Sequence, residues 1–228
     1  MTHTGFASIK TLAFLAALLL SVSAHGQEPD AQPGKWRWDL SLDLPIWPSL
    51  ADLQPPTGSF DGFGYGLGMS AHTPVKQFQA GELMLGFDGS IAATPSNIRG
   101  SFDKLLARQL YLGVSAKLLF GPRKAMSLDA GIGYHEVDMA QVDSNWYGTL
   151  EYEHWSASSA SSFIGATWDI GAGQAEHNSG LFVGLRVHFA DFGSIYDKEF
   201  VPGQPALGPG AGTLDGPLYM LRIGYSGR

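Results

Sequence analysis

Apolar and polar residues alternate one by one along eight segments of this 228-residue chain. In the first segment Trp38, Leu40 and Leu42 fall on one face, whereas Asp39 and Ser41 fall on the other. Successive side chains of a β-strand point to opposite faces, so this period of two predicts strands with one apolar and one polar face. The alternating segments are residues 36–46, 62–70, 82–91, 109–120, 126–135, 160–170, 181–190 and 219–225.

The connections between these segments alternate in length. The long gaps are about 48–60, 92–107, 139–158 and 192–216, and the short gaps are about 72–80, 121–125 and 171–180. Outer-membrane barrels have long extracellular loops and short periplasmic turns. The alternative architectures, a soluble β-sandwich or a lipocalin-like barrel, give no reason for such a regular alternation of loop lengths.

Aromatic residues gather at both ends of the predicted strands. At the end where the chain enters the first strand lie Trp36, Trp38, Phe120, Trp168 and Tyr225. At the opposite end lie Trp47, Phe63, Tyr134, Phe189 and Tyr219. Aromatic rings suit the headgroup level of a bilayer, and a spanning sheet must close because an open edge leaves backbone groups unpaired in lipid. We therefore predict an all-β fold, a closed eight-stranded antiparallel up-and-down transmembrane β-barrel.

The first 24 residues have the features of a secretory signal peptide. Lys10 precedes the apolar run 11–20, and small residues up to Ala24 offer a cleavage site. The predicted organisation is a signal peptide at 1–24, a short periplasmic lead-in at 25–35 and an outer-membrane barrel at 36–228. The chain has no cysteine for a disulfide or a thiolate metal site. Its net charge of −7 argues against a nucleic-acid partner.

Over residues 36–225 the strand pattern resembles the small eight-stranded outer-membrane barrels of Gram-negative bacteria. This group includes OmpX and the transmembrane part of OmpA. The resemblance implies localisation in the outer membrane, contact with lipid and lipopolysaccharide, and insertion by the barrel-assembly machinery. Chains of this group end in an aromatic residue that the machinery recognises. Here Ser226, Gly227 and Arg228 follow Tyr225, so the chain departs from the family at that point.

Charged residues fall on the face that we expect to line the lumen. The acids are Asp39, Asp43, Glu82, Asp88, Asp129 and Asp169, and the bases are Arg37, Arg108, Lys117, Arg186 and Arg222. Side chains just fill the interior of an eight-stranded barrel, and charges buried there must be paired. We predict a salt-bridge plug in which Arg186 or Arg222 pairs with Asp39, Asp43 or Asp129. A narrow pore is the alternative, because glycines at 62–68 thin one wall.

Two groups of residues have spacings that suggest hydrolysis. His154 and Ser156 have the His-x-Ser spacing of outer-membrane lipid A deacylases, in which histidine activates the serine. The surrounding sequence does not otherwise match, and no carboxylate follows at a comparable distance. Ser127, Asp129 and His135 share one strand face. However, six residues of strand separate Asp129 from His135 by roughly 20 Å, which excludes a triad of these three alone.

The histidines show no metal-ligand spacing. His72, His177 and His188 are scattered, and we expect His188 to be a neutral member of the interior network. The sequence thus predicts no catalytic, cofactor-binding or metal site, and no cofactor. The predicted function is a non-enzymatic outer-membrane protein with an envelope-structural or surface-interaction role, its four long loops open to an extracellular ligand. The alternatives are a narrow pore or small-ligand conduit and a lipid A-modifying enzyme.

Overall fold

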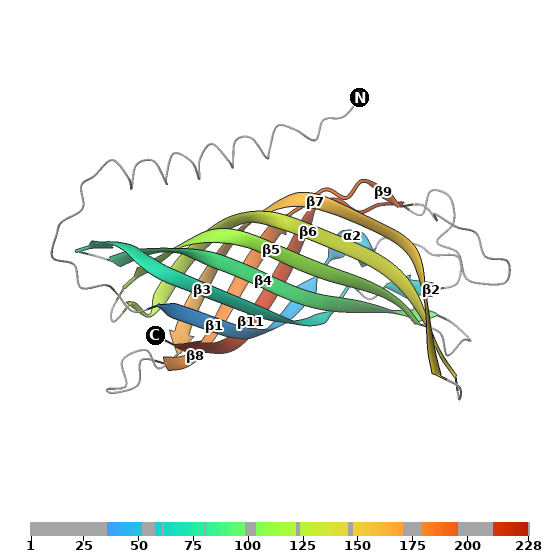
Figure 1. Cartoon of the computed structure of the whole chain (residues 1–228), viewed down its shortest axis with the longest axis horizontal. Helices are drawn as coiled ribbons and strands as arrows, with labels where there is room; N and C mark the ends of the chain where they lie inside the picture. Colours follow the sequence, from blue (N-terminus) through green and yellow to red (C-terminus); the bar gives the residue numbers. More distant parts are fainter. Residues whose placement is uncertain are drawn as a thin grey trace, which may run out of the picture.

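In the computed structural model the strands close into a single barrel (Figure 1). The structure describes residues 36–51, 58–60, 62–79, 81–98, 104–121, 124–145, 148–170, 179–195 and 212–227. The predicted signal peptide at 1–24, the lead-in at 25–35 and His177 lie outside these ranges.

Eight long strands form the barrel wall. They are β1 (Arg37–Ile46), β3 (Tyr65–Phe78), β4 (Gly81–Ile98), β5 (Lys104–Phe120), β6 (Met126–Asn145), β7 (Gly148–Ile170), β8 (Ser179–Phe189) and β11 (Pro217–Gly227). Each pairs antiparallel with its neighbours in the chain, and β1 pairs with both β3 and β11, which closes the sheet. The predicted closed, antiparallel, up-and-down barrel is therefore confirmed.

Four short elements lie in the connections at one end of the barrel. They are α2 (Pro48–Ala51), β2 (Gly58–Phe60), β9 (Ser194–Ile195) and β10 (Gly212–Thr213). Strand β2 pairs with the end of β4, and β9 pairs with β10. Among the described residues, no helix is long and apolar enough to cross a membrane. We call this end distal and the opposite end, where β1 begins, proximal.

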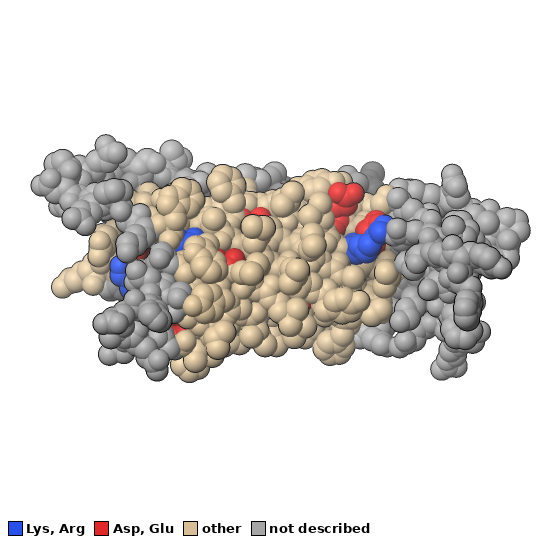
Figure 2. Space-filling model, turned by 60° about the horizontal axis from the view of Figure 1, so that its bottom comes forward, with Lys and Arg blue, Asp and Glu red and all other residues tan. Residues whose placement is uncertain are grey.

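The barrel wall is apolar outside and polar inside. Along β1, Asp39, Ser41 and Asp43 are buried, whereas Leu40 and Leu42 are exposed. Figure 2 shows a mostly tan outer surface, with a group of charged residues beside the grey atoms at its right-hand end. A soluble protein rarely exposes so large a continuous apolar surface, and a wall of this kind matches lipid. The alternation that predicted the strands therefore also separates the two faces as expected.

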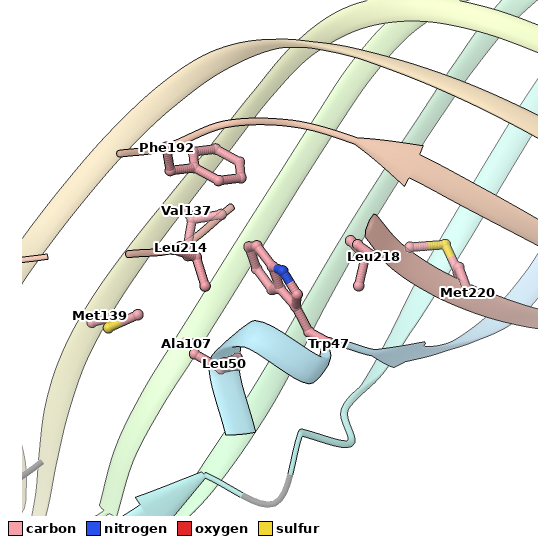
Figure 3. Packing of buried hydrophobic residues seen from close by; sticks show 9 residues of the cluster. All are labelled: Trp47, Leu50, Ala107, Val137, Met139, Phe192, Leu214, Leu218 and Met220. Carbon is pink, nitrogen blue, oxygen red and sulfur yellow. The ribbon is translucent and has the colours of Figure 1, made fainter. Parts of the chain in front are cut away.

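Exposed aromatic side chains mark both ends of the wall. They include Trp36, Trp38, Trp168 and Tyr225 at the proximal end, and Phe63, Tyr134, Phe189 and Tyr219 at the distal end. The prediction for Trp47 was wrong, because this side chain is only 1% exposed. The chain turns inward after β1 and carries Trp47 and α2 into the barrel mouth, away from the outer surface (Figure 3).

The distal strands run further than the alternation indicated. Strand β4 continues to Ile98 and β5 starts at Lys104, while β6 continues to Asn145 and β7 starts at Gly148. The predicted loops at 92–107 and 139–158 are therefore wrong, since most of both segments is paired strand. The sequence signal fails there because a strand that leaves the bilayer has water on its outer face and no longer needs an alternating pattern.

We predict that Leu185→Arg strongly impairs folding into liposomes. Leu185 is 50% exposed on the outer face of β8, where a charge near the bilayer midplane costs roughly 2–4 kcal/mol. The measurement is the urea dependence of unfolding from phosphatidylcholine liposomes. Leu185→Phe is the matched control, and it should unfold close to the wild-type midpoint. Equal midpoints for the arginine variant and wild type would place Leu185 away from lipid.

Candidate functional site

The centre of the lumen is organised around the guanidinium of Arg186. Its Nη2 lies 2.6 Å from Asp88 and 2.5 Å from Asp129, and its Nε donates to Asp129 at 2.8 Å. The hydroxyl of Ser115 donates to Asp88, and Nε2 of His72 lies 2.8 Å from that hydroxyl oxygen. One arginine from β8 thus ties together a carboxylate from β6, two strands away in the sheet, and one from β4, on the opposite side of the barrel.

A second network fills the proximal half of the lumen. Asp39 accepts hydrogen bonds from Arg37 at 2.9 Å, from Ser70 at 3.1 Å and from Lys117. Arg37 also makes a bidentate pair with Asp169, at 2.7 and 2.9 Å. Such two-pronged guanidinium–carboxylate pairs are among the strongest charged hydrogen bonds in proteins. They tie β1 to β7 across the lumen.

A third pair joins the two neighbouring strands β1 and β11. Arg222 Nε donates to Asp43 at 3.0 Å, and its Nη2 donates to Ser41 at 2.8 Å. Together with the pair between Arg186 and Asp129, this contact confirms the predicted pairing of luminal arginines with Asp43 and Asp129.

The luminal charges are paired by direct contact between bases and acids. The bases of these networks are Arg37, Lys117, Arg186 and Arg222, and the acids are Asp39, Asp43, Asp88, Asp129 and Asp169. All nine residues are buried, and each base contacts at least one carboxylate. Paired charges are the only ones that a barrel interior can hold at tolerable cost. The charged side chains of the described lumen thus form ion pairs, as the sequence predicted.

One predicted member of the lumen lies elsewhere. Arg108 is on the outer face of β5, where its Nε donates to Asp138 of β6 at 2.8 Å, and 41% of its side chain is exposed. Its neighbours Ala107 and Gln109 are the buried, inward residues of that stretch. The sequence prediction for Arg108 was wrong because charge alone assigned it to the lumen, against the alternation of its own strand.

A layer of rings lies next to the ion pairs in the lumen. The ring of Tyr111 lies 5.0 Å from that of His188 and 5.9 Å from that of His135, measured between centroids. Phe163 packs 5.1 Å from His188 and carries the guanidinium of Arg186 on its face at 4.2 Å. His188 therefore lies in the interior, as predicted. Among the described residues, no three side chains of metal-binding type are grouped as a metal site.

An apolar cap lies beside these rings at the distal mouth, where Trp47 and Phe192 pack against His135. Figure 3 shows the residues of the cap. It comprises Trp47, Leu50, Ala107, Val137, Met139, Phe192, Leu214, Leu218 and Met220. Trp47 and Leu50 enter from the connection after β1, and Phe192 and Leu214 enter from the connection between β8 and β11. Sequence reasoning missed the cap because its key residues lie in connections that carry no periodic pattern.

The distal parts of β6 and β7 form a ribbon that extends from the end of the barrel, and β5 pairs with β6 as far as Val142. Strand β7 pairs with β6 along Gly148–Trp168 but with β8 only along Ser162–Ile170. Figure 1 shows β6 and β7 continuing past the other strands at the lower right. The register shifts so that Met139 pairs with Trp155 and Ala140 with Glu153, which makes His154 an extra residue. Such a β-bulge bends the strand and increases its twist.

The candidate His-x-Ser pair lies on this ribbon. Ser156 is opposite Asp138, on the outer face of the sheet. Asp138 is a carboxylate that the sequence analysis missed, because that analysis looked only downstream of the serine. The carboxylate of Asp138 accepts hydrogen bonds from Arg108. The side chain of His154 lies outside the described residues.

Comparison with known proteins adds little beyond the fold. No family model matches the sequence, and no curated protein is similar to it. Three solved structures of outer-membrane proteins share its small barrel architecture. The Neisserial surface protein A is 10% identical, with a TM-score of 0.44 over 86% of this chain and 99% of that chain.

The other two similar structures are equally remote in sequence. Ail of Yersinia pestis, solved with the heparin analogue sucrose octasulfate, is 12% identical, with a TM-score of 0.39 over 84% of this chain and 95% of that chain. OprG of Pseudomonas aeruginosa is 10% identical, with a TM-score of 0.40 over 86% of this chain and 96% of that chain. Similarity at this level carries no argument about function, which must come from the chain's own residues.

We predict that Arg222→Leu and Asp43→Leu each lower the free energy of unfolding by roughly 3–5 kcal/mol, because each leaves a buried charge unpaired. The double variant should recover at least half of the summed loss, which a double-mutant cycle in urea measures. Lys124→Ala is the control. Its pair with Glu82 is partly exposed, so the loss should stay under about 1 kcal/mol. Additive losses for Arg222→Leu and Asp43→Leu would contradict direct pairing.

Proposed function

We propose that this chain is a non-conducting protein of the outer membrane of a Gram-negative bacterium, and that it displays the β6–β7 ribbon outside the cell for interaction with other molecules. In this proposal the barrel-assembly machinery inserts the chain, and lipid and lipopolysaccharide surround its wall. The barrel is the anchor, and the ribbon is the functional part.

The observation that carries the proposal is the change of surface along β6. Its outward residues Leu128, Ile132 and Tyr134 are apolar or aromatic, and the next outward residues are Glu136 and Asp138. Lipid suits the first group and water suits the second. The strand nevertheless continues as far as Asn145. The ribbon therefore extends beyond the apolar wall. Ordering it there costs stability, so we expect it to have a function.

The same change from apolar to charged outward residues occurs on the neighbouring strand. On β5, outward Leu110 and Leu112 give way to Arg108, which is paired with Asp138. Extracellular connections of outer-membrane barrels are longer than periplasmic ones. The extended strands and the connection from β8 to β11 are both distal. We therefore assign the distal end to the outside and the proximal end to the periplasm.

The filled lumen argues for an anchor and against a pore. Ions crossing the barrel must pass the paired charges around Arg186 and then the apolar cap around Trp47. To open that path, buried ion pairs must separate and the cap residues must leave the mouth. Each of these changes costs on the order of several kcal/mol.

We predict no steady conductance from the purified full-length barrel in a planar bilayer at neutral pH. The reason is that the path through the barrel meets the buried ion pairs around Arg186 and then the apolar cap around Trp47. A general trimeric porin reconstituted in the same bilayer is the positive control. Discrete, long-lived conductance steps that scale with the amount of barrel would support the narrow-pore alternative and contradict a sealed anchor.

Hydrolysis of lipid A is the second candidate, and one observation favours it. The register sets Asp138 opposite Ser156 on the outer face of β6 and β7, beside the position of lipid headgroups. A serine, a histidine and a carboxylate are the groups that acyl-ester hydrolysis uses. Because Asp138 is engaged by Arg108, we rank this candidate below the anchor.

We predict that lipid A from bacteria expressing the chain has the same acyl composition as lipid A from cells carrying an empty vector. Mass spectrometry of extracted lipid A is the measurement. Loss of an acyl chain in the wild type that is abolished by Ser156→Ala would instead establish the hydrolase. Ser158→Ala is the matched control. Ser158 also faces outward on β7, two residues after Ser156, and lies opposite Glu136.

A further inference from the structure

We infer that the apolar cap at the distal mouth is an acid-sensitive latch. Two neutral histidines, His135 and His188, hold the cap closed, and their protonation releases it. Release exposes the apolar residues of the cap at the distal surface, a change that the proposed function does not include. The inference holds whichever side of the membrane the distal end faces.

The two histidines lie next to each other in the lumen, beside the cap. Their ring centroids are 5.9 Å apart, and each residue is only 1% exposed. The ring of His135 lies 5.2 Å from that of Phe192 and 6.3 Å from that of Trp47, the two aromatic residues of the cap. His135 therefore connects the cap to the interior of the barrel.

The ring nitrogens of this pair are poorly provided with hydrogen bonds. Both nitrogens of His188 and Nδ1 of His135 are buried and have no partner among the described residues. The hydroxyl of Tyr111 is also unpaired, and it lies over Gly113 of its own strand. A neutral imidazole donates one N–H, whereas an imidazolium donates two and carries a charge that must be stabilised. The arrangement therefore suits neutral histidines.

The charges that face His188 do not suit a second cation. They are Arg186 of β8, Arg222 of β11 and Asp88 of β4. Asp88 is already paired with Arg186 at 2.6 Å. From β7 the facing group is the ring of Phe163, with its centroid 5.1 Å from that of His188. An aromatic face attracts a cation only weakly and does not replace a carboxylate.

The groups that face His135 are rings from every side. Trp47 and Phe192 come from the cap, Tyr111 comes from β5 and His188 comes from β8. If both histidines gain a proton, two like charges lie side by side in the lumen, and like charges at this separation repel. Acid therefore acts against the closed arrangement.

A third buried histidine shows the opposite environment. Nε2 of His72 lies 2.8 Å from the hydroxyl of Ser115 and 3.5 Å from the carboxylate of Asp88. A proton on His72 meets a carboxylate, whereas a proton on His188 meets two guanidinium groups as well. His72 is therefore not part of the latch.

The cap is the part of this region that can move. The wall strands that carry the histidines are paired there, with Tyr111 opposite His135 and Phe163 opposite His188. The aromatic residues of the cap instead lie in the connections that follow β1 and β8. When the cap leaves, water can solvate the protonated rings. The open form therefore binds more protons than the closed form, so falling pH favours opening and rising pH favours closure.

The test measures the distance between two spin labels in the full-length barrel in lipid nanodiscs. Asp215→Cys places one label on an exposed residue beside Leu214 of the cap, and Glu136→Cys places the other on the outer face of β6. Electron–electron double resonance should show a broader and longer distance distribution at about pH 4 than at about pH 7.5, a range that includes the ordinary histidine pKa of about 6.5. The original distribution should return at about pH 7.5.

A label pair on the wall shows whether the change is confined to the cap. Glu136→Cys combined with Leu185→Cys should give the same distance distribution at both pH values, because the paired strands between these positions stay in place. A change in this pair as well would indicate general loosening of the barrel and would contradict a latch.

Variants assign the response to the two histidines. Replacing both His135 and His188 by phenylalanine should abolish it, so that the distribution at about pH 7.5 persists at about pH 4. Glutamine at both positions is the second version if phenylalanine prevents folding, and the same result is expected. His72→Gln is the matched control and should respond as wild type does. Heat-modifiable migration on gels will show that each variant forms a closed barrel.

The remaining outcomes overturn the inference. An identical distribution for the wild type at both pH values would show that the cap is no latch. A response that persists without His135 and His188 would assign the titration to other groups. Loss of the response in His72→Gln would place the switch at the ion pairs around Asp88 instead.

Discussion

The contact of Arg186 with Asp88 and Asp129 is the interaction on which the rest of the structure depends. A barrel with an apolar outer wall must enclose the polar faces of all its strands. Those faces carry charged side chains. The free-energy cost of burying them is tolerable only when each pairs with a side chain of opposite charge. Arg186 meets this condition at the centre of the lumen, because one side chain satisfies carboxylates from two strands that are not neighbours.

From Arg186 towards the distal mouth, the type of side chain in the lumen changes. The ion pairs give way to the rings of Tyr111, His135 and His188, and then to the apolar cap around Trp47. The described interior therefore holds paired charges, rings and apolar side chains in succession towards the distal mouth. In the proposed function, interaction with other molecules falls to the distal surface, where the apolar wall ends at Tyr134 and the strands continue.

The sequence predicted the barrel wall well because a strand in lipid must alternate apolar outward residues with polar inward ones. In β1 the alternation of Asp39, Leu40 and Ser41 both identified the strand and assigned its faces. The rule ends with the bilayer, so the strand extensions to Ile98 and Asn145 were mistaken for loops. Cross-lumen partners such as Arg37 and Asp169 also lay beyond prediction, since they depend on the stagger of strands around the barrel.

The most direct test of the account is spin labelling in lipid bilayers, for which the absence of native cysteine is convenient. Single cysteines would replace Leu112, Leu128 and Leu185 on the wall and Glu136 just beyond it. Power-saturation measurements would compare collisions with oxygen and with a water-soluble nickel complex. The account predicts oxygen-dominated collisions at the three leucine positions and nickel-dominated collisions at Glu136. Nickel-dominated collisions at all four positions would contradict a membrane-spanning barrel.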